Sequence, residues 1–174
     1  MILTTERLRF DVWSEDKLPL AEALWCDAEV TRFIGGPFTR EQVQARVARE
    51  IANFAAHGVQ YWPIFERESG QHAGCCGLRP YDLDARIFAM GFHLLPQHWG
   101  KGYAREASLA VIEHAFTSLN TSKLFAGHHP QNERSRKTLI ALGFEYWRDE
   151  LYPPTGLMHP WYRVKKSEAG SEAQ

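Results

Sequence analysis

The stretch from Leu94 to Ala104 constrains the fold of this chain more than any other segment. A strand-like apolar segment ends there, a loop with Gly100 and Gly102 follows, and a helix-like pattern begins at once. Backbone amides at such a junction point outward without partners, and the helix dipole adds partial positive charge. Glycines let a ligand approach the main chain closely. The junction therefore predicts a phosphate site, although a turn that merely starts a helix has the same pattern.

Strand and helix periods alternate along the rest of the chain. Alternating apolar residues predict strands over 8–13, 60–67, 72–79, 87–95 and 123–128, with a closing pair at 146–152 and 161–164. Helical spacing predicts helices over 14–25, from a Thr39–Gln42 capping box to Gly58, over 102–115 and over 133–142. This order predicts an α/β fold of mixed α+β type, with helices on both faces of one sheet. Residues 1–164 are expected to form a single domain, and 165–174 a polar, disordered tail.

The composition limits the classes of partner. With 174 residues, 44% of them hydrophobic and 24% charged, the chain fits one globular domain. A formal net charge of −1 gives no field that would recruit nucleic acid or an anionic membrane. Three cysteines make no disulfide framework, and the sequence shows neither a secretory signal pattern nor an apolar run of membrane-spanning length. We therefore expect a cytoplasmic protein.

The eight histidines do not indicate a metal site. His128 and His129 are adjacent, so on a strand their side chains would point in opposite directions. The chain contains no Cys-x-x-Cys and no His-x-x-x-His pattern. We therefore expect no bound metal.

A second polar cluster begins at Asn132 and is followed by Leu142-Gly143-Phe144. Asn132 is a good N-cap for the helix that follows, with Ser135 one turn inside. The same spacing would also turn both side chains toward one ligand. The basic run nearby has two interpretations: cations directed at a phosphate, or an ordinary solvated face formed by Arg134, Arg136 and Lys137.

Taken in order, the two clusters resemble the GNAT superfamily of N-acetyltransferases. The segment Gln97-x-x-Gly100-x-Gly102-Tyr103-Ala104 matches the pyrophosphate motif of that family, and Asn132-x-x-Ser135 with Leu142-Gly143-Phe144 matches its second block. The opening segment 3–10 and the segment 99–107 are similar to the RimJ/RimL branch, which includes enzymes that acetylate the α-amino group of ribosomal proteins. The resemblance spans residues 3–164.

The resemblance implies a GNAT fold, a mostly antiparallel mixed sheet that splays at the site of the co-substrate acetyl-CoA. It assigns that site to the pyrophosphate loop, the main chain of the preceding strand and the second block: Phe92, His93, Leu94, Gln97, Gly100, Lys101, Gly102, Tyr103, Ala104, Asn132 and Ser135. Of these, Asn132 and Ser135 would also be catalytic: Asn132 would contact the pantetheine or acetyl end, and Ser135 would protonate the departing thiolate. The primary amine of a protein N-terminus or a small molecule would attack directly in a ternary complex. A non-catalytic acyl-CoA-binding module is the alternative, and the chain would be a monomer or homodimer.

The general base departs from the family pattern. Many relatives carry a Glu two residues before the position of Gly91, where this chain has Ala89. His93 shares a strand face with Gly91, and His128 ends the next strand, so either imidazole is a candidate base. For each, the other interpretation is a packed or surface histidine without a catalytic role. A site without a carboxylate base suits an α-amino group (pKa about 8) better than a lysine amine (pKa about 10.4).

Overall fold

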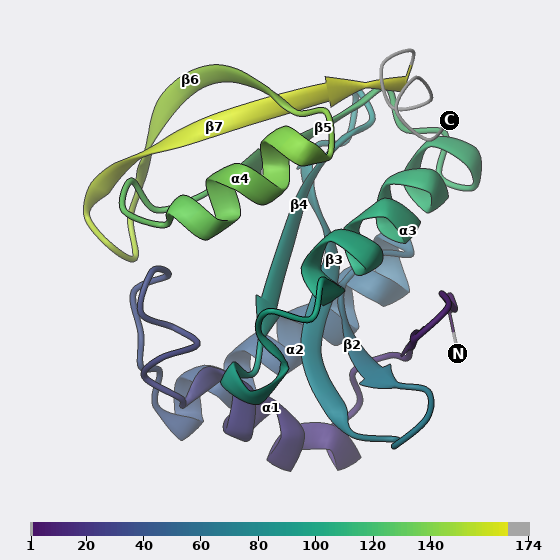
Figure 1. Ribbon diagram of the computed structural model, residues 1–174, viewed down its shortest axis with the longest axis vertical. Coiled ribbons are helices and arrows are strands. Elements are labelled where there is room, and N and C mark those ends of the chain that lie inside the picture. Colours follow the sequence, from purple (N-terminus) through teal and green to yellow (C-terminus); the bar gives the residue numbers. More distant parts are fainter. Residues whose placement is uncertain (1, 167–174) are drawn as a thin grey trace.

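The computed structural model describes residues 2–166, which fold around one seven-stranded sheet (Figure 1). The strand order is β1-β2-β3-β4-β5-β7-β6. The strands are β1 (Leu8–Phe10), β2 (Tyr61–Glu66), β3 (His72–Asp82), β4 (Ile87–Leu94), β5 (Lys123–Gly127), β6 (Glu145–Tyr152) and β7 (Leu157–Lys165). The helices are α1 (Leu18–Trp25), α2 (Arg40–His57), α3 (Tyr103–Thr117) and α4 (Glu133–Ala141), with 3₁₀ turns η1 (Glu15–Lys17) and η2 (Pro96–His98).

The pairing of β4 with β5 is the feature that opens the sheet. It is the parallel pair, whereas the other neighbouring strands run antiparallel. Pairing runs from Ile87 opposite Lys123 to Ala89 opposite Phe125 and then stops, although β4 continues to Leu94 and β5 to Gly127. The predicted mixed, mostly antiparallel sheet that splays in its centre is confirmed.

The sheet separates two hydrophobic cores, because neighbouring residues of a strand face opposite sides. In Figure 1, α3 and α4 cross in front of the sheet and α2 lies behind it. Cys76 faces the core under α3, together with residues such as Val111, while Cys75 faces the core under α1 and α2 with Trp25. Both thiols are fully buried, and burial raises the pKa of Cys75 to about 12. They therefore behave as small apolar side chains.

Local signals set the helix ends as predicted. Thr39 and Gln42 form the complete capping box of α2, and Gly58 ends that helix in the left-handed conformation at φ +71°. The structure changes several strand boundaries. β1 ends at Phe10 instead of residue 13, and β7 begins at Leu157 instead of residue 161, because 153–156 make a tight turn. β7 also includes Lys165, the first residue of the predicted tail, while 167–174 lie outside the described residues.

None of the helices in the described range is both long and apolar enough to cross a bilayer.

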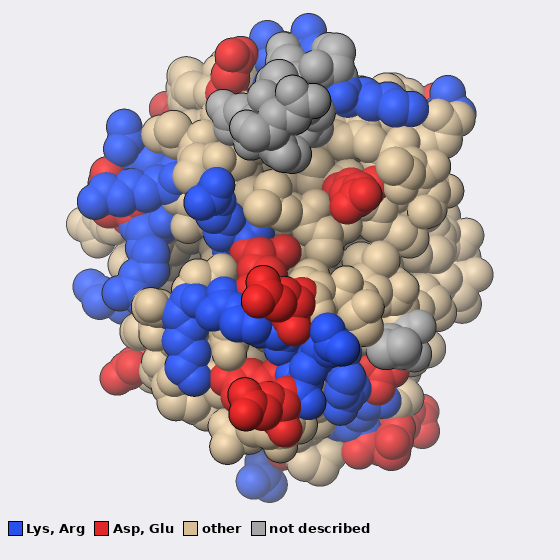
Figure 2. Space-filling model, turned by 45° about the vertical axis from the view of Figure 1, so that its right-hand side comes forward, with Lys and Arg blue, Asp and Glu red and all other residues tan. Residues whose placement is uncertain are grey.

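On the face shown in Figure 2, acidic and basic side chains alternate across the lower half, whereas basic ones gather along the left-hand margin.

The protonation of His72 makes the stability of the core depend on pH. Its ring is buried against Trp13 and Phe65 and donates from Nε2 to the carbonyl oxygen of Gly74 at 2.9 Å, while Nδ1 has no partner in the described chain. Burial lowers the pKa of His72 from 6.5 to about 4. The unfolded chain therefore takes up this proton first as the pH falls below about 6.5.

We predict that the free energy of unfolding falls between pH 6.5 and 4, with His72 contributing up to about 3 kcal/mol of the loss. The variant His72→Gln keeps a donor for Gly74 but cannot titrate, so it should lose less stability over this range. Urea unfolding at pH 7, 5.5 and 4 measures both slopes. Equal slopes in the two proteins would contradict the prediction.

Candidate functional site

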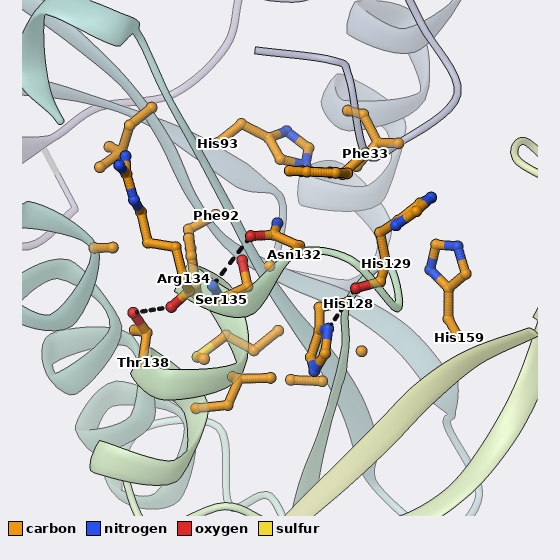
Figure 3. Close-up of a pocket in the computed structure, with 18 of the residues that line it drawn as sticks. Phe33, Phe92, His93, His128, His129, Asn132, Arg134, Ser135, Thr138 and His159 are labelled. Carbon is orange, nitrogen blue, oxygen red and sulfur yellow. Dashed lines mark hydrogen bonds between the residues drawn. The ribbon is translucent and has the colours of Figure 1, made fainter. Parts of the chain in front are cut away.

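A cavity of about 1130 Å³ occupies the opening between β4 and β5. Its walls are the splayed part of β4, the end of β5 and the first turn of α4. At one end the cavity reaches the loop before α3. At the other end it reaches the 29–34 loop, Arg46 of α2 and Tyr61 of β2. Figure 3 shows His93 and Phe33 on one side of this space and Asn132 and Ser135 on the α4 side. The cavity has the size of a pocket for a large cofactor.

The loop before α3 presents free backbone donors. Gly100 and Gly102 lie at φ +76° and +81°, in the left-handed region that favours glycine. Within residues 2–166, no side chain caps α3 at Gly102. The amides from Gly100 to Ala104 donate to no acceptor in the described chain, and Gly100, Gly102 and Ala104 line the cavity. This is the anion-binding geometry expected of a helix N-terminus.

Glu66, at the end of β2, holds this loop from outside the cavity. Its Oε1 accepts hydrogen bonds from Lys101 Nζ (3.1 Å) and Tyr103 Oη (2.9 Å), and His98 Nδ1 lies 3.0 Å away. Hydrogen bonds from Ser69, Lys101 and Tyr103 lower the pKa of Glu66 to about 2. The side chains of Lys101 and Tyr103 therefore point toward β2. Sequence analysis missed Glu66, because no local pattern links it to a loop more than thirty residues away.

Two residues assigned to the cofactor by resemblance lie outside the cavity lining. Neither Gln97 nor Lys101 belongs to it, so for Lys101 the assignment depends on the backbone amide. In the basic run, the Arg134 guanidinium lies 5.1 Å from the centre of the Trp99 ring, and both residues line the cavity. Arg136 instead pairs with Glu133 at 2.8 Å. Within this run, only Arg134 is thus placed to meet a cofactor.

The second block, Asn132 and Ser135, lies at the splay of β4 and β5. Asn132 caps α4 by accepting a hydrogen bond from the Ser135 amide at 3.2 Å (Figure 3). The Ser135 hydroxyl makes no hydrogen bond in the described chain and lines the cavity, as does Asn132. Across the opening, Phe92, His93 and Leu94 line the cavity from the part of β4 that has no partner on its β5 side. The cap and the ligand-facing interpretations are therefore compatible.

The hydrogen bonds of His93 argue against its role as a base. The indole N–H of Trp25 donates to His93 Nδ1 at 3.0 Å. Burial, helped by the charges of Arg46 and Arg79, holds the pKa of His93 well below its usual value, so the ring is neutral at pH 7. Since an indole nitrogen can only donate, the single ring proton of His93 lies on Nε2. His93 therefore offers a donor to the cavity and not a free lone pair.

His128 is also occupied at both ring nitrogens. Nδ1 donates to the carbonyl oxygen of His129 at 2.7 Å, and Nε2 accepts from the hydroxyl of Tyr162 at 3.1 Å. Burial lowers the pKa of His128, which keeps this ring neutral. Neither predicted base therefore has a free acceptor nitrogen.

His159, which sequence analysis did not single out, has one ring nitrogen without a partner in the described chain, unlike these rings. Thr155 Oγ1 lies 2.7 Å from His159 Nε2 and donates to the Tyr152 carbonyl at 3.3 Å; in the tautomer that carries its ring proton on Nε2, His159 donates to Thr155 and keeps its lone pair on Nδ1. Its Nδ1 has no partner in the described chain, and His159 lines the cavity. Burial and the neighbouring histidines lower the pKa of His159 to about 4. His129 differs, because its Nδ1 already accepts from the Gln131 amide at 3.0 Å.

Comparison with known proteins agrees with this geometry. The model of the acetyltransferase (GNAT) domain family matches residues 7–145. The chain belongs to the GNAT acetyltransferase family. The uncharacterized N-acetyltransferase p20 of Bacillus licheniformis is 31% identical over 145 residues, which are 82% of this chain and 82% of that protein. The uncharacterized protein YkkB of Bacillus subtilis is 27% identical over 146 residues, 83% of this chain and 85% of its own length.

Solved structures show the same fold. An acetyltransferase from Agrobacterium tumefaciens has a TM-score of 0.80 at 26% identity and covers 94% of each chain. RimL, a ribosomal α-N-protein acetyltransferase solved in complex with coenzyme A, has a TM-score of 0.81 over 94% of this chain and 97% of its own. At 14% identity, that likeness concerns the fold alone. Membership of the family makes this GNAT protein an acyltransferase of the N-acetyltransferase class, as predicted.

We predict that Gly102→Ala weakens the binding of coenzyme A about tenfold or more, since a Cβ at φ +81° distorts the loop whose amides face the phosphates. Gly70→Ala is the matched control, because Gly70 has φ +74° with open space around it, in the turn after β2. Both changes should cost roughly 1 kcal/mol of stability. Calorimetric titration separates them: equal affinity in the two variants would refute a role for the loop in binding.

Proposed function

We propose that this GNAT protein transfers the acetyl group of acetyl-CoA to a primary amine by direct attack in a ternary complex. The observation that carries the proposal is the cavity at the splay of β4 and β5, with free amides at Gly100–Ala104 at one end and the unpaired length of β4 along its wall. Pyrophosphate fits the amides, and an amide-containing pantetheine arm fits an unpaired strand edge.

The cofactor then occupies the cavity in one direction. Its pyrophosphate lies at Gly100–Ala104, and Arg134 over Trp99 adds a cation at that end. The pantetheine arm continues along Phe92, His93 and Leu94. The thioester thereby reaches Asn132 and Ser135. An amine held in line with it gains the advantage of proximity, which reaches about 7–11 kcal/mol in well-oriented reactions.

Ser135 is the proposed acid for the departing thiolate. Its hydroxyl is unpaired within the described chain, and its amide already serves the Asn132 cap. The variant Ser135→Ala therefore removes the hydroxyl and leaves the cap intact.

We predict that Ser135→Ala lowers kcat roughly a hundredfold, the lower range for a general acid, and leaves the affinity for coenzyme A within about twofold. Steady-state thiol release and calorimetry measure the two quantities. An equal loss in both would mean that Ser135 serves binding or helix structure and does not act as the acid.

Two features of the site help the incoming ammonium lose its proton. With its ring proton on Nε2, His159 offers a free lone pair at Nδ1 on the acceptor side, directly or through water, and takes the place of His93 and His128 as the candidate base. The surrounding cations Arg46 and Arg79 also disfavour a second positive charge, so they lower the pKa of a bound ammonium. The neutral amine is thus favoured even where Ala89 replaces a carboxylate.

We predict that His159→Gln lowers kcat/KM about tenfold or more at pH 7, with a smaller loss at pH 9, where more amine enters already deprotonated. His57→Gln, at the exposed end of α2, is the matched control. The pH profile of kcat/KM for a single amine measures the effect. A loss that is the same at both pH values would assign His159 a structural role.

The acceptor is an amine of a protein N-terminus or a small molecule, and the opening segment favours the RimJ/RimL branch by similarity of sequence. We place the catalytic domain at residues 1–164, working in the cytoplasm as a monomer or homodimer. Thiol release from acetyl-CoA with a panel of peptides and small amines tests the proposal. Binding of acetyl-CoA with no thiol release on any amine would favour a non-catalytic acyl-CoA-binding module.

A further inference from the structure

A pair of arginines lies at the end of the cavity away from the phosphate loop. Arg46 comes from α2 and Arg79 from β3, and both line the cavity. They stand on the α1–α2 face of the sheet, whereas the loop 100–104 begins α3 on the other face. This group, with Glu50 and Tyr61, is called here the arginine cluster.

The charges of the arginine cluster do not balance. The Glu50 side chain is 1% exposed and accepts a hydrogen bond from the Tyr61 backbone amide at 2.7 Å. It also lies 3.6 Å from a guanidinium nitrogen of Arg79. Arg46 forms no hydrogen bond and no ion pair with any described group. It is 9% exposed, its Nε is buried without a partner, and its guanidinium lies 4.3 Å from the centre of the Trp25 ring. Two cations thus face one carboxylate.

Burial without a partner makes the surplus charge costly. Desolvation, followed by repulsion from Arg79, lowers the pKa of Arg46. A buried guanidinium is ordinarily paired, because its five donors lose water and need acceptors. An anion that enters the cavity would supply those acceptors. The cluster therefore lacks one anionic partner.

The remaining groups around the cluster are donors or neutral. His93 offers Nε2–H, since Trp25 occupies its Nδ1. Tyr61 lies across the strand position of Gly91, where an added Cβ would clash with its hydroxyl. Ala89 pairs with Arg79 across β3 and β4 and brings no charge. The buried thiol of Cys75 is neutral, since burial raises its pKa to about 12. Among the groups that act on Arg46, Glu50 is thus the one carboxylate, and it already pairs with Arg79.

We propose that the acceptor is a small amine that also carries a carboxylate, as a free amino acid does, and that Arg46 and Arg79 bind this carboxylate while the amine faces the thioester. The proposal rests on the proposed function and narrows its acceptor. The negative groups of coenzyme A belong at the opposite end of the cavity, so they do not satisfy this cluster. A peptide N-terminus carries an amide in place of the carboxylate and would leave Arg46 unpaired.

The test compares free L-amino acids with their own carboxamides as acceptors. We expect wild-type kcat/KM to favour the free acid, and the ratio of acid to amide to fall about tenfold or more in Arg46→Gln. Comparing this ratio between proteins cancels the intrinsic difference in amine basicity. Arg46→Gln is the cleaner variant, because it leaves the Glu50–Arg79 pair in place. Arg79→Lys keeps the positive charge but loses the guanidinium that can bind a carboxylate through two nitrogens, so the ratio of acid to amide should fall less than in Arg46→Gln.

Two further variants fix the interpretation. Glu50→Gln can still accept from the Tyr61 amide but removes the carboxylate, so the preference for the free acid should hold or rise. Arg148→Gln, whose guanidinium pairs with Glu150 at 2.6 Å on β6 outside the cavity lining, should keep the wild-type ratio. Thermal unfolding checks that each variant is folded. An unchanged ratio in a folded Arg46→Gln overturns the proposal, as does better use of peptides or carboxamides than of free acids.

A binding measurement separates this inference from the proposed function. Calorimetry of the protein loaded with coenzyme A, titrated with N-acetyl amino acids and with their amides, needs no turnover. Stronger binding of the acids that is lost in Arg46→Gln supports the cluster even if no amine is acetylated. The opposite outcome is that the protein acetylates amines with and without a carboxylate equally well and binds acids and amides equally. That result would refute this inference but would still support acetyl transfer.

Discussion

The site depends on the end of β-pairing between β4 and β5. Antiparallel neighbours hold the rest of the sheet together, but the parallel pair stops after Ala89 and Phe125. From there the main chain of β4 has an unpaired edge, which in a buried sheet would be unfavourable without another partner. A ligand with amide groups is such a partner. The same divergence opens a passage between the two faces, so the cofactor and the acceptor can reach one point from opposite sides of the sheet.

Glu66 and the left-handed glycines keep the donor loop in shape. The amides from Gly100 to Ala104 can bind an anion only if they remain free and point toward one place. Glu66 helps to keep them so, because it holds the side chains of Lys101 and Tyr103 on the outer side of the loop. A second support is Arg7, which donates to the Lys101 carbonyl at 2.8 Å and pairs with Glu106 at 2.7 Å in the first turn of α3. The loop is therefore organised before any cofactor arrives, which lowers the entropic cost of binding.

The sequence predicted the parts of this architecture that local chemistry determines. The capping box at Thr39, the cap at Asn132 and the glycine loop before α3 are short patterns whose physics lies within a few residues. The ends of β1 and β7 depended on partner strands and a tight turn, so periodicity misplaced them. The arginine cluster could not be predicted, because Arg46 lies on a helix and Arg79 on a strand, and only the packing of α2 on the sheet brings them together.

The histidines show why residue type alone cannot assign a proton's route. His93 and His128 line the cavity, but Trp25 and Tyr162 use their acceptor nitrogens. A neutral imidazole has one acceptor, so a hydrogen bond to that atom decides its chemistry regardless of its distance from the substrate. The position of Ala89 is then consistent with the rest of the site. A carboxylate at position 89 would lie opposite Arg79 and would pair with the guanidinium that the proposed acceptor needs. Alanine leaves Arg46 and Arg79 able to bind the carboxylate of the acceptor and to lower the pKa of its ammonium group.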